Sequence, residues 1–307
     1  MSQLECHGNT VVVVGQPVAW QMVYRWTRGR GDRGPAEGRP LRAFECDRSR
    51  VREAVSRPPA GPNATDPLSS RYDPAWLLDL DMGPNPLWML EDLAQDLDLH
   101  GGMRVLDLGS GKGASSVFLA REYGVEVVAA DLWIAPEQAA AVFAEAGVGD
   151  RVEAVRAEAH TLPFEERSFD AIVSVDAFEY FGTADGYLPY LLRFLRPGGQ
   201  LGIATPAMTR EIRELGMIPA HIKNLVGWEA IAWHTAEWWR FQWEITELVT
   251  VTSARLQENA WRDWLLWARA GAEHHPNGQR RNQPVIEMLT ADGGEYLSFA
   301  LVTARKN

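Results

Sequence analysis

The chain has 307 residues, of which 46% are hydrophobic, and a formal net charge of -11. This length and apolar content suffice for one large domain with a full core, whereas no run of eighteen apolar residues is present to form a transmembrane helix. The acidic balance argues against nucleic acid as a partner, and the two cysteines, Cys6 and Cys46, argue against a disulfide framework and favour the reducing cytoplasm.

The first 70 residues differ from the rest of the chain. They contain ten arginines, no lysine and seven acidic residues, so their net charge is +3. Two of their segments, 29–40 and 56–67, are rich in Gly and Pro and lack periodicity, which is typical of linkers and disordered chain. We expect residues 1–70 to be a poorly ordered leader or a stretch outside the native protein, and residues 71–307 to form a single domain.

A turn and a helix precede the first predicted strand of this domain. Proline on either side of Asn85 marks the turn, and Asn85 is placed to cap a helix over residues 87–97. Two interpretations stay open. Tyr72 and the turn at 82–85 line a ligand site, or the whole segment is a plain cap on the edge of the sheet.

Residues 105–113 read VLDLGSGKG, an apolar strand that runs into three glycines and then into a helix-like stretch. Glycine permits tight turns and close approach to a ligand, and the start of the helix offers free N–H groups and a positive dipole end. The segment therefore predicts binding of a nucleotide-like ligand. A P-loop is excluded because its GxxxxGK[ST] spacing is absent. The dinucleotide pattern is met only loosely, and Asp107 would repel a pyrophosphate but suits a ligand with an ammonium group.

The stretch Asp107-Leu108-Gly109-Ser110-Gly111-Lys112-Gly113 resembles the first motif, (D/E)xGxGxG, of the class I S-adenosylmethionine-dependent methyltransferases. Four later segments agree with that family in order and spacing: VEVVAAD at 125–131, RVEAVRAEAH at 151–160, TLPFEERSFDAIVSV at 161–175 and LRPGGQLGIATPA at 195–207. The most similar branch is that of the ubiquinone/menaquinone-type and cyclopropane-synthase-like small-molecule enzymes. A nicotinamide-dependent oxidoreductase remains the alternative.

The resemblance implies S-adenosylmethionine as cofactor and a set of residues that hold it. Asp131 would accept hydrogen bonds from the ribose hydroxyls, Leu132 and Trp133 would flank the adenine ring, and Glu158 would meet the adenine amine. The expected cofactor-binding residues are Asp107, Gly109, Ser110, Gly111, Gly113, Asp131, Leu132, Trp133, Glu158, Ala159 and Asp176.

The segment SVDAFEYFG, just past the predicted fourth strand, holds candidates for the chemistry. Strand ends of this kind face the ligand crevice in open α/β sheets. Glu179, Asp176 and His160 are the candidate catalytic residues, and a general base is needed only for an acceptor that keeps a proton at neutral pH. A helix N-cap for Asp176 and a structural role for His160 stay open. No metal site is expected.

Tryptophan is concentrated in the last third, with eight of thirteen between residues 228 and 267. Three of these recur at i, i+3 and i+6 from Trp261, which is typical of a buried helix stripe. Others fall in a segment at 208–245, between the fifth and sixth strands, where we expect an aromatic substrate wall with core packing as the alternative. The expected substrate-binding residues are Tyr72, Tyr180, Trp233 and Trp238.

The C-terminal part completes the predicted fold. Residues 246–256 predict a sixth strand and residues 258–271 an amphipathic helix. Residues 285–305 alternate around Asp292-Gly293-Gly294, which predicts a hairpin, and the resemblance implies that YLSFALVTA lies antiparallel between strands five and six. We expect an α/β fold, a Rossmann-like seven-stranded, mostly parallel sheet with helices on both faces and an antiparallel C-terminal strand.

The sequence therefore predicts an enzyme that moves a methyl group from S-adenosylmethionine to a small-molecule acceptor by direct in-line displacement. Covalent attack on cytosine is excluded because the core holds no cysteine, and the (D/N)PP(Y/F) sequence of amino-methyltransferases is absent. Two alternatives stay open, a non-methylating enzyme (cyclisation, elimination or aminocarboxypropyl transfer) and a non-catalytic cofactor-binding protein. No membrane partner is expected, and a homodimer is one open assembly.

Overall fold

The computed structural model describes residues 4–7, 10–13, 67–274 and 278–307, and the chain divides into two compact units, 1–45 and 46–307. In the first unit, β1 (Leu4–His7) and β2 (Thr10–Val13) pair as an antiparallel hairpin. All other described elements belong to the second unit. The expectation of a disordered or non-native leader over 1–70 falls mostly outside the described residues.

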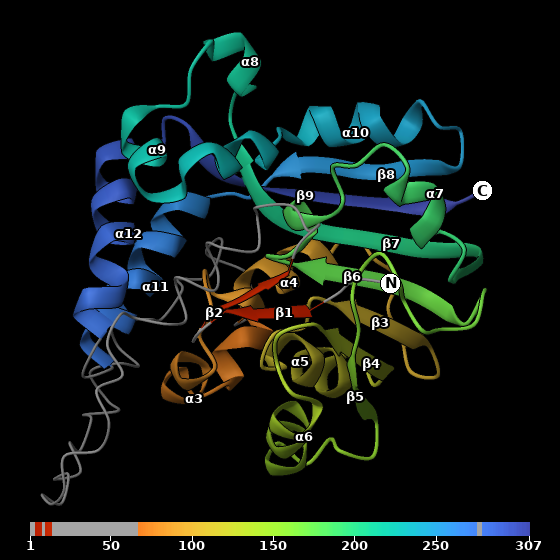
Figure 1. The fold of residues 1–307 in the computed structure, drawn as a ribbon. Coiled ribbons are helices and arrows are strands. Elements are labelled where there is room, and N and C mark those ends of the chain that lie inside the picture. The colour runs from red at the N-terminus through yellow and green to blue at the C-terminus, as the bar shows by residue number, and fades with distance from the viewer. Residues whose placement is uncertain (1–3, 8–9, 14–66, 275–277) are drawn as a thin grey trace, which may run out of the picture. The chain divides into compact units, whose positions relative to one another are not determined.

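A seven-stranded sheet in the order β5-β4-β3-β6-β7-β9-β8 forms the centre of the second unit (Figure 1). The strands are β3 (Arg104–Leu108), β4 (Glu126–Asp131), β5 (Val152–Arg156), β6 (Phe169–Val175), β7 (Leu195–Met208), β8 (Val249–Leu256) and β9 (Leu297–Lys306). The first five strands of that order are parallel, and β9 runs antiparallel to both of its neighbours. The predicted mostly parallel sheet, with an antiparallel C-terminal strand between the fifth and sixth, is confirmed.

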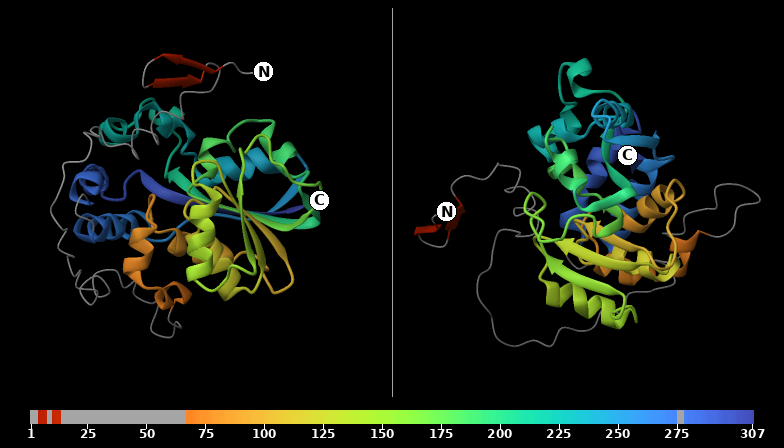
Figure 2. Two further views of the ribbon diagram at one scale, coloured as in Figure 1. Left: turned by 60° about the horizontal axis from the view of Figure 1, so that its bottom comes forward. Right: turned by 90° about the vertical axis from the view of Figure 1, so that its right-hand side faces the viewer.

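Helices cover both faces of this sheet (Figures 1 and 2). Because side chains alternate along a strand, Val105 joins a core with α4 (Pro86–Ala94) and α5 (Ala114–Glu122), whereas Leu106 joins a core with α7 (Tyr187–Leu191) and α10 (Ala236–Glu244). The helices are η1 (Leu68–Arg71), α3 (Pro74–Asp79), α4 (Pro86–Ala94), α5 (Ala114–Glu122), α6 (Pro136–Glu145), η2 (Phe178–Tyr180), α7 (Tyr187–Leu191), α8 (Ile212–Leu215), α9 (Ala220–Val226), η3 (Gly227–Ala232), α10 (Ala236–Glu244), α11 (Ala260–His274) and α12 (Gly278–Asp292).

Local signals set two of these helices as the sequence predicted. The Asn85 side chain accepts hydrogen bonds from the backbone N–H groups of Leu87 at 3.0 Å and Trp88 at 3.3 Å, which caps α4. In α11 the tryptophan stripe faces inward, with Trp267 fully buried in the core between α11 and α4. Apolar residues at helical spacing therefore mark both helices.

The predicted hairpin around Asp292-Gly293-Gly294 is wrong, because residues 278–292 form α12. Gly293 and Gly294 have positive φ, and the Gly293 N–H donates to the Leu289 carbonyl oxygen at 3.1 Å. The Asp292 carboxylate also accepts the N–H of Leu297. Glycine in the left-handed region ends a helix as readily as it turns a hairpin, so the same residues fit both structures.

Candidate functional site

The candidate site lies at the carboxyl edge of the parallel strands. β4, β3 and β6 are adjacent in the sheet, and the chain moves outward from β3 to β4 and β5 before it returns to β6 on the other side (Figure 1). Such a reversal leaves a crevice beyond the strand ends. The loops that leave these strands carry the glycines 109–113, residues 131–133 and residues 176–180, so the structure brings the predicted segments to one edge.

The glycine loop, residues 109–113, is shaped by the packing of the chain itself. Gly109 and Gly113 have φ of +80° and +97°. A Cβ on Gly109 would stand 2.4 Å from the Cβ of Ala177, and one on Gly113 would stand 2.3 Å from the ring of Phe143. These two glycines let the loop pack against the exit of β6 and against α6. The N–H groups of Gly109 and of the buried Ser110 donate to the Ala130 carbonyl oxygen on β4.

Asp131 ties the end of β4 to the glycine loop. Its Oδ2 accepts the N–H of Gly111 at 2.9 Å, and its Oδ1 accepts the N–H groups of Trp133 at 2.8 Å and Ile134 at 2.9 Å. A carboxylate has about four acceptor sites. Asp131 therefore fixes the loop and keeps acceptor capacity for a ligand.

Asp107, at the end of β3, is fully buried. Its Oδ2 accepts the hydroxyls of Ser115 and Ser116, both at 2.6 Å, in the first turn of α5. Burial raises the pKa of Asp107 to about 6, although the two serines act in the opposite direction. Its Oδ1 is buried and has no hydrogen-bond partner within the described part of the chain, which is rare for a buried carboxylate oxygen.

The turn at Met82–Asn85 packs over the glycine loop and the exit of β6. A Cβ on Gly111 would stand 3.0 Å from the Sδ of Met82, and a Cβ on Gly83 would stand 2.4 Å from Oδ2 of Asp176. These contacts favour the interpretation that the turn lines the site over that of a plain cap on the sheet edge.

Asp81 anchors this turn, and the sequence reasoning missed it. The buried carboxylate accepts the indole N–H of Trp267 from α11 at 2.9 Å and forms a salt bridge of 3.1 Å with Arg281 from α12. Burial raises the pKa of Asp81, and Arg281 opposes this. No local pattern pairs residues so far apart in the chain.

Tyr72 does not belong to this group. It is buried beside Phe118, with ring centroids 5.6 Å apart, and its hydroxyl is 3.1 Å from the carboxylate of Glu122. Glu122 ends α5, whereas the glycine loop precedes the first residue of that helix. Tyr72 therefore packs at the far end of α5, and the structure does not support a role in substrate binding.

Asp176 follows β6 directly and has a strained backbone, with φ of +54°. Its N–H donates to the Ala204 carbonyl oxygen on β7 at 2.8 Å, and no hydrogen bond to its carboxylate is found within the described ranges. Burial, with the nearby carboxyls of Glu179 and Asp81, raises the pKa of Asp176 well above its ordinary value. The N-cap of η2 is Ala177, so the N-cap interpretation of Asp176 is wrong.

Glu179 lies in η2 and is buried. Its Oε2 accepts the hydroxyl of Thr205, from β7, at 2.7 Å. Burial raises the pKa of Glu179 to about 7, against the hydrogen bond from Thr205, which lowers it. The half-buried Asp176 carboxyl lies within the electrostatic influence of the buried Glu179 carboxyl, so the two form a pair at the exit of β6.

Glu158 and His160 are partners of each other. The His160 ring Nδ1 is 2.7 Å from Oε1 of Glu158, and the His160 backbone N–H donates to Oε2 at 3.0 Å. Although burial raises the pKa of Glu158, these contacts lower it on balance. His160 is exposed and its ring also contacts Tyr187. Together these contacts favour the structural role for His160.

Two exposed aromatic rings meet across the glycine loop. Trp133 follows β4 and Tyr180 ends η2, and their ring centroids are 6.0 Å apart in an edge-to-face arrangement. The two residues are 41% and 44% exposed. Since β3 lies between β4 and β6, this contact spans the exit of β3. Leu132 and Ala159 are half-buried beside these loops.

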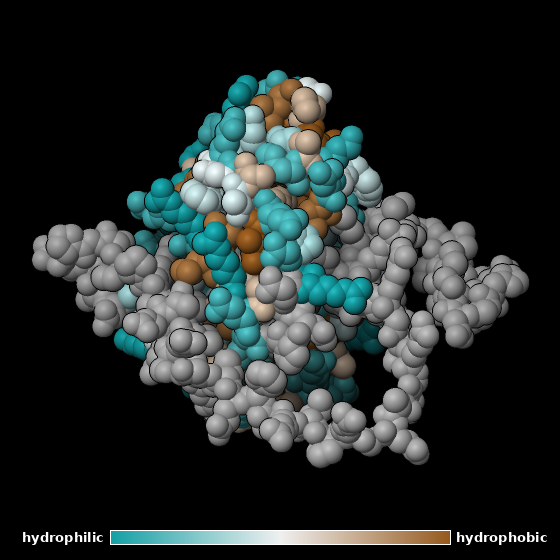
Figure 3. All heavy atoms as spheres, turned by 90° about the vertical axis from the view of Figure 1, so that its left-hand side faces the viewer, coloured by the Kyte–Doolittle hydropathy of each residue, from teal (hydrophilic) through white to brown (hydrophobic). Residues whose placement is uncertain are grey.

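The segment at 208–245 forms α8, α9, η3 and α10. Trp238 stacks on His234 with ring centroids 3.6 Å apart, and Trp233 packs near Trp264 of α11. These contacts favour core packing for both predicted wall residues. The segment nevertheless exposes Met217 and Trp228, and apolar side chains, drawn brown, gather at the top of Figure 3, where α8 and α9 lie in Figure 1.

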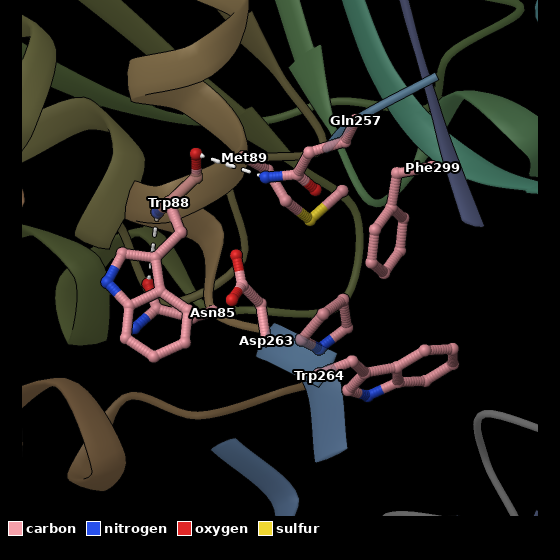
Figure 4. A pocket seen from close by; sticks show the side chains of 8 residues that line it. Asn85, Trp88, Met89, Gln257, Asp263, Trp264 and Phe299 are labelled. Carbon is pink, nitrogen blue, oxygen red and sulfur yellow. Dashed lines mark hydrogen bonds between the residues drawn. The ribbon is translucent and has the colours of Figure 1, made fainter. Parts of the chain in front are cut away.

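A small cavity lies behind the Met82–Asn85 turn, between α4, α11 and β9 (Figure 4). Its volume of about 10 Å³ is that of a single water molecule, so the cavity does not accommodate a substrate. Its lining residues are Pro84, Asn85, Trp88, Met89, Gln257, Asp263, Trp264 and Phe299.

Among residues 4–7, 10–13, 67–274 and 278–307, no three His, Cys, Asp or Glu side chains are grouped so that they could hold a metal ion. No helix in the same ranges is long and apolar enough to cross a bilayer.

Most of the known proteins that this chain resembles are methyltransferases. Residues 105–199 match the model of a methyltransferase domain. The chain is 36% identical over 121 residues to methyltransferase GfsG of Streptomyces halstedii, which covers 38% of this chain and 42% of that protein. It is 37% identical over 155 residues to demethylmenaquinone methyltransferase of Clavibacter sepedonicus, which covers 50% and 61%. The matches thus span less than two thirds of either relative.

Solved structures share the fold at low sequence identity. Geranyl diphosphate C-methyltransferase of Streptomyces coelicolor A3(2) superposes with a TM-score of 0.62 at 16% identity, over 95% of this chain and all of that one. Phosphoethanolamine N-methyltransferase 2 of Haemonchus contortus also gives 0.62, at 19% identity, over 83% of this chain and 60% of that one. At these identities the likeness is one of fold.

Proposed function

We propose that this chain, a member of the class I S-adenosylmethionine-dependent methyltransferase family through its domain at residues 105–199, transfers a methyl group from S-adenosylmethionine to a small-molecule acceptor. One observation carries the proposal. The glycine loop held by Asp131 lies on the same sheet edge as the carboxyl pair Asp176 and Glu179. The loop that is proposed to bind the methyl donor and the candidate base thus lie at the same edge of the sheet.

The residues at this edge fit the cofactor. Asp131 retains acceptor capacity for the ribose hydroxyls, and the unpartnered Oδ1 of Asp107 suits the ammonium group of the methionine end. Trp133 and Leu132 are proposed to flank the adenine ring. Glu158, although engaged with His160, keeps acceptor sites for the adenine amine.

S-adenosylmethionine, when bound, supplies a methyl group that is already activated on a sulfonium. The protein therefore contributes mainly alignment of the acceptor. Where the acceptor carries a proton, Glu179 is the proposed base that accepts it, and a pKa of about 7 suits a base at neutral pH. Tyr180 and Trp133 are proposed to form the aromatic entrance to the acceptor site, with the 208–245 segment beside it.

Calorimetry followed by product analysis tests this function. The full chain should bind S-adenosylmethionine and ignore NAD, because Asp107 disfavours a pyrophosphate. Incubation with acceptors drawn from the relatives, such as demethylmenaquinone, sterols and sarcosine, should release S-adenosylhomocysteine with one acceptor class. Methylthioadenosine as the product would favour the non-methylating alternative, and tight binding without turnover on a broad panel would favour a non-catalytic role.

Cellular context is part of the same proposal. The net charge of -11 and the two cysteines support a cytoplasmic protein without a nucleic-acid partner. Light scattering of the purified chain would test the further hypothesis that it forms a homodimer.

A further inference from the structure

β7 holds both members of the carboxyl pair. Its ladder with β6 pairs Val175 with Ala204, and the Ala204 carbonyl oxygen accepts the backbone N–H of Asp176 at 2.8 Å. The next residue, Thr205, is fully buried, and its hydroxyl donates to Oε2 of Glu179 at 2.7 Å. One dipeptide of β7 thus fixes the backbone of Asp176 and the side chain of Glu179.

The two carboxyl groups have unequal surroundings. Glu179 receives a hydrogen bond from Thr205, whereas the Asp176 carboxylate has none from the described residues and faces the charges of Glu179 and Asp81. The other titratable groups nearby are Tyr180 of η2 and Glu229 of η3. Arg281 faces Asp81 and is engaged with it. Lys112 of the glycine loop also faces Asp81. The charges that act directly on Asp176 are those of the carboxyl groups of Glu179 and Asp81.

Two neighbouring carboxyl groups in such surroundings do not both ionise at neutral pH. The group that receives a hydrogen bond ionises first, because an O–H donor stabilises the charged form. We propose that Thr205 is a positioning residue whose hydroxyl makes Glu179 the ionised member of the pair and leaves Asp176 as a protonated carboxylic acid.

The assignment gives the two carboxyl groups different tasks. Glu179 takes the proton that the acceptor releases, while Asp176 keeps its own proton and offers an O–H donor at the exit of β6. Only the role of Glu179 as the base rests on the proposed function. The distribution of protons between the two groups is measurable on the full chain without an acceptor.

Carboxyl ¹³C NMR on the full chain tests the proposal, with the Glu179 signal assigned through Glu179→Gln and the Asp176 signal through Asp176→Asn. In the parent chain a carboxyl that titrates near pH 7 should vanish in Glu179→Gln and persist in Asp176→Asn. Thr205→Val, which keeps the side-chain shape, should move this midpoint upward by about one to two pH units. Thr205→Ser, which keeps the hydroxyl, should restore it.

Three outcomes would overturn the proposal: an unchanged midpoint in Thr205→Val, a shift of equal size in Thr205→Ser, or loss of the signal in Asp176→Asn instead of Glu179→Gln. Should Thr205→Val fail to fold, Thr205→Ala takes its place as the variant without the hydroxyl, and the same upward shift is expected. Calorimetry with S-adenosylmethionine on the same samples separates the two claims. Failure to bind it would count against the proposed function and leave the proton assignment standing.

Discussion

The two sides of the candidate site are held by contacts that differ greatly in sequence separation, the number of residues between the two partners. On the proposed cofactor side, formed by the exits of β3 and β4, Asp131 lies 20 residues from its loop partner, and Asp107 lies eight and nine residues from its two serines. On the acceptor side, the exit of β6 with the turn above it, Asp81 is held by Trp267, 186 residues away, and by Arg281, 200 residues away.

This difference explains what the chain shares with its relatives. The domain match covers residues 105–199, which includes the whole cofactor side. Thr205, Trp267, Arg281 and the 82–85 turn all lie outside it. The contacts that hold the glycine loop thus lie within the matched stretch, whereas those that hold the 82–85 turn come from helices outside it. The domain match therefore contains the proposed donor site but not the contacts that hold the 82–85 turn.

The largest expected effect comes from the glycine loop. Gly109→Val places a branched side chain where a Cβ would already stand 2.4 Å from Ala177, at φ of +80°. The loop must move away from the exit of β6, so binding of S-adenosylmethionine in calorimetry should fall by at least about a hundredfold, or close to 3 kcal/mol.

Gly198→Val is the matched control for this loop variant. Gly198 also has positive φ, but a Cβ there would meet nothing within 4 Å. Both variants should keep the circular dichroism of the parent chain. Normal cofactor affinity in Gly109→Val would show that the loop is not the donor site.

The carboxyl pair should give the next largest effect. Glu179→Gln removes the candidate base, so turnover measured as release of S-adenosylhomocysteine should fall by about 10²-fold or more, with the cofactor affinity unchanged. In the parent chain turnover should rise as the pH increases through about 7, because the base works only when ionised. Glu153→Gln, at an exposed residue of β5, should behave like the parent. An unaltered rate in Glu179→Gln would remove this residue from the base role.

The long-range anchor of the turn gives a smaller effect on stability. Asp81→Ala leaves the buried Trp267 indole and the Arg281 guanidinium without their carboxylate, so the free energy of unfolding in urea should fall by about 3 kcal/mol. Cofactor affinity should fall by about tenfold, since the 82–85 turn loses its support. Arg193→Ala breaks an exposed ion pair with Glu166 and should change stability by less than about 1 kcal/mol. Equal losses in the two variants would refute the anchor.

The same difference in sequence separation determines which contacts of the site can be predicted from the sequence. The glycines and Asp131 have a spacing set by one strand, one helix and the next strand, so their meeting follows from the local pattern. Asp81 and Thr205 carry no such pattern, because their partners are chosen by tertiary packing. The contacts of Tyr72 are unpredictable for the same reason, since its place in the chain does not reveal which end of α5 it packs against.

The aromatic entrance gives the smallest expected effect and links the two sides. Trp133 belongs to the proposed cofactor side and Tyr180 to the proposed acceptor side, and their rings meet edge-to-face with centroids 6.0 Å apart. Trp133→Ala should weaken binding of S-adenosylmethionine by about three- to tenfold, the worth of one aromatic contact, and Trp133→Phe should retain most of the affinity. Trp228→Ala removes a similarly exposed tryptophan from η3 and should leave binding unchanged. If both alanine variants lose affinity equally, the loss follows from removing any exposed tryptophan. In that case Trp133 does not flank the adenine ring.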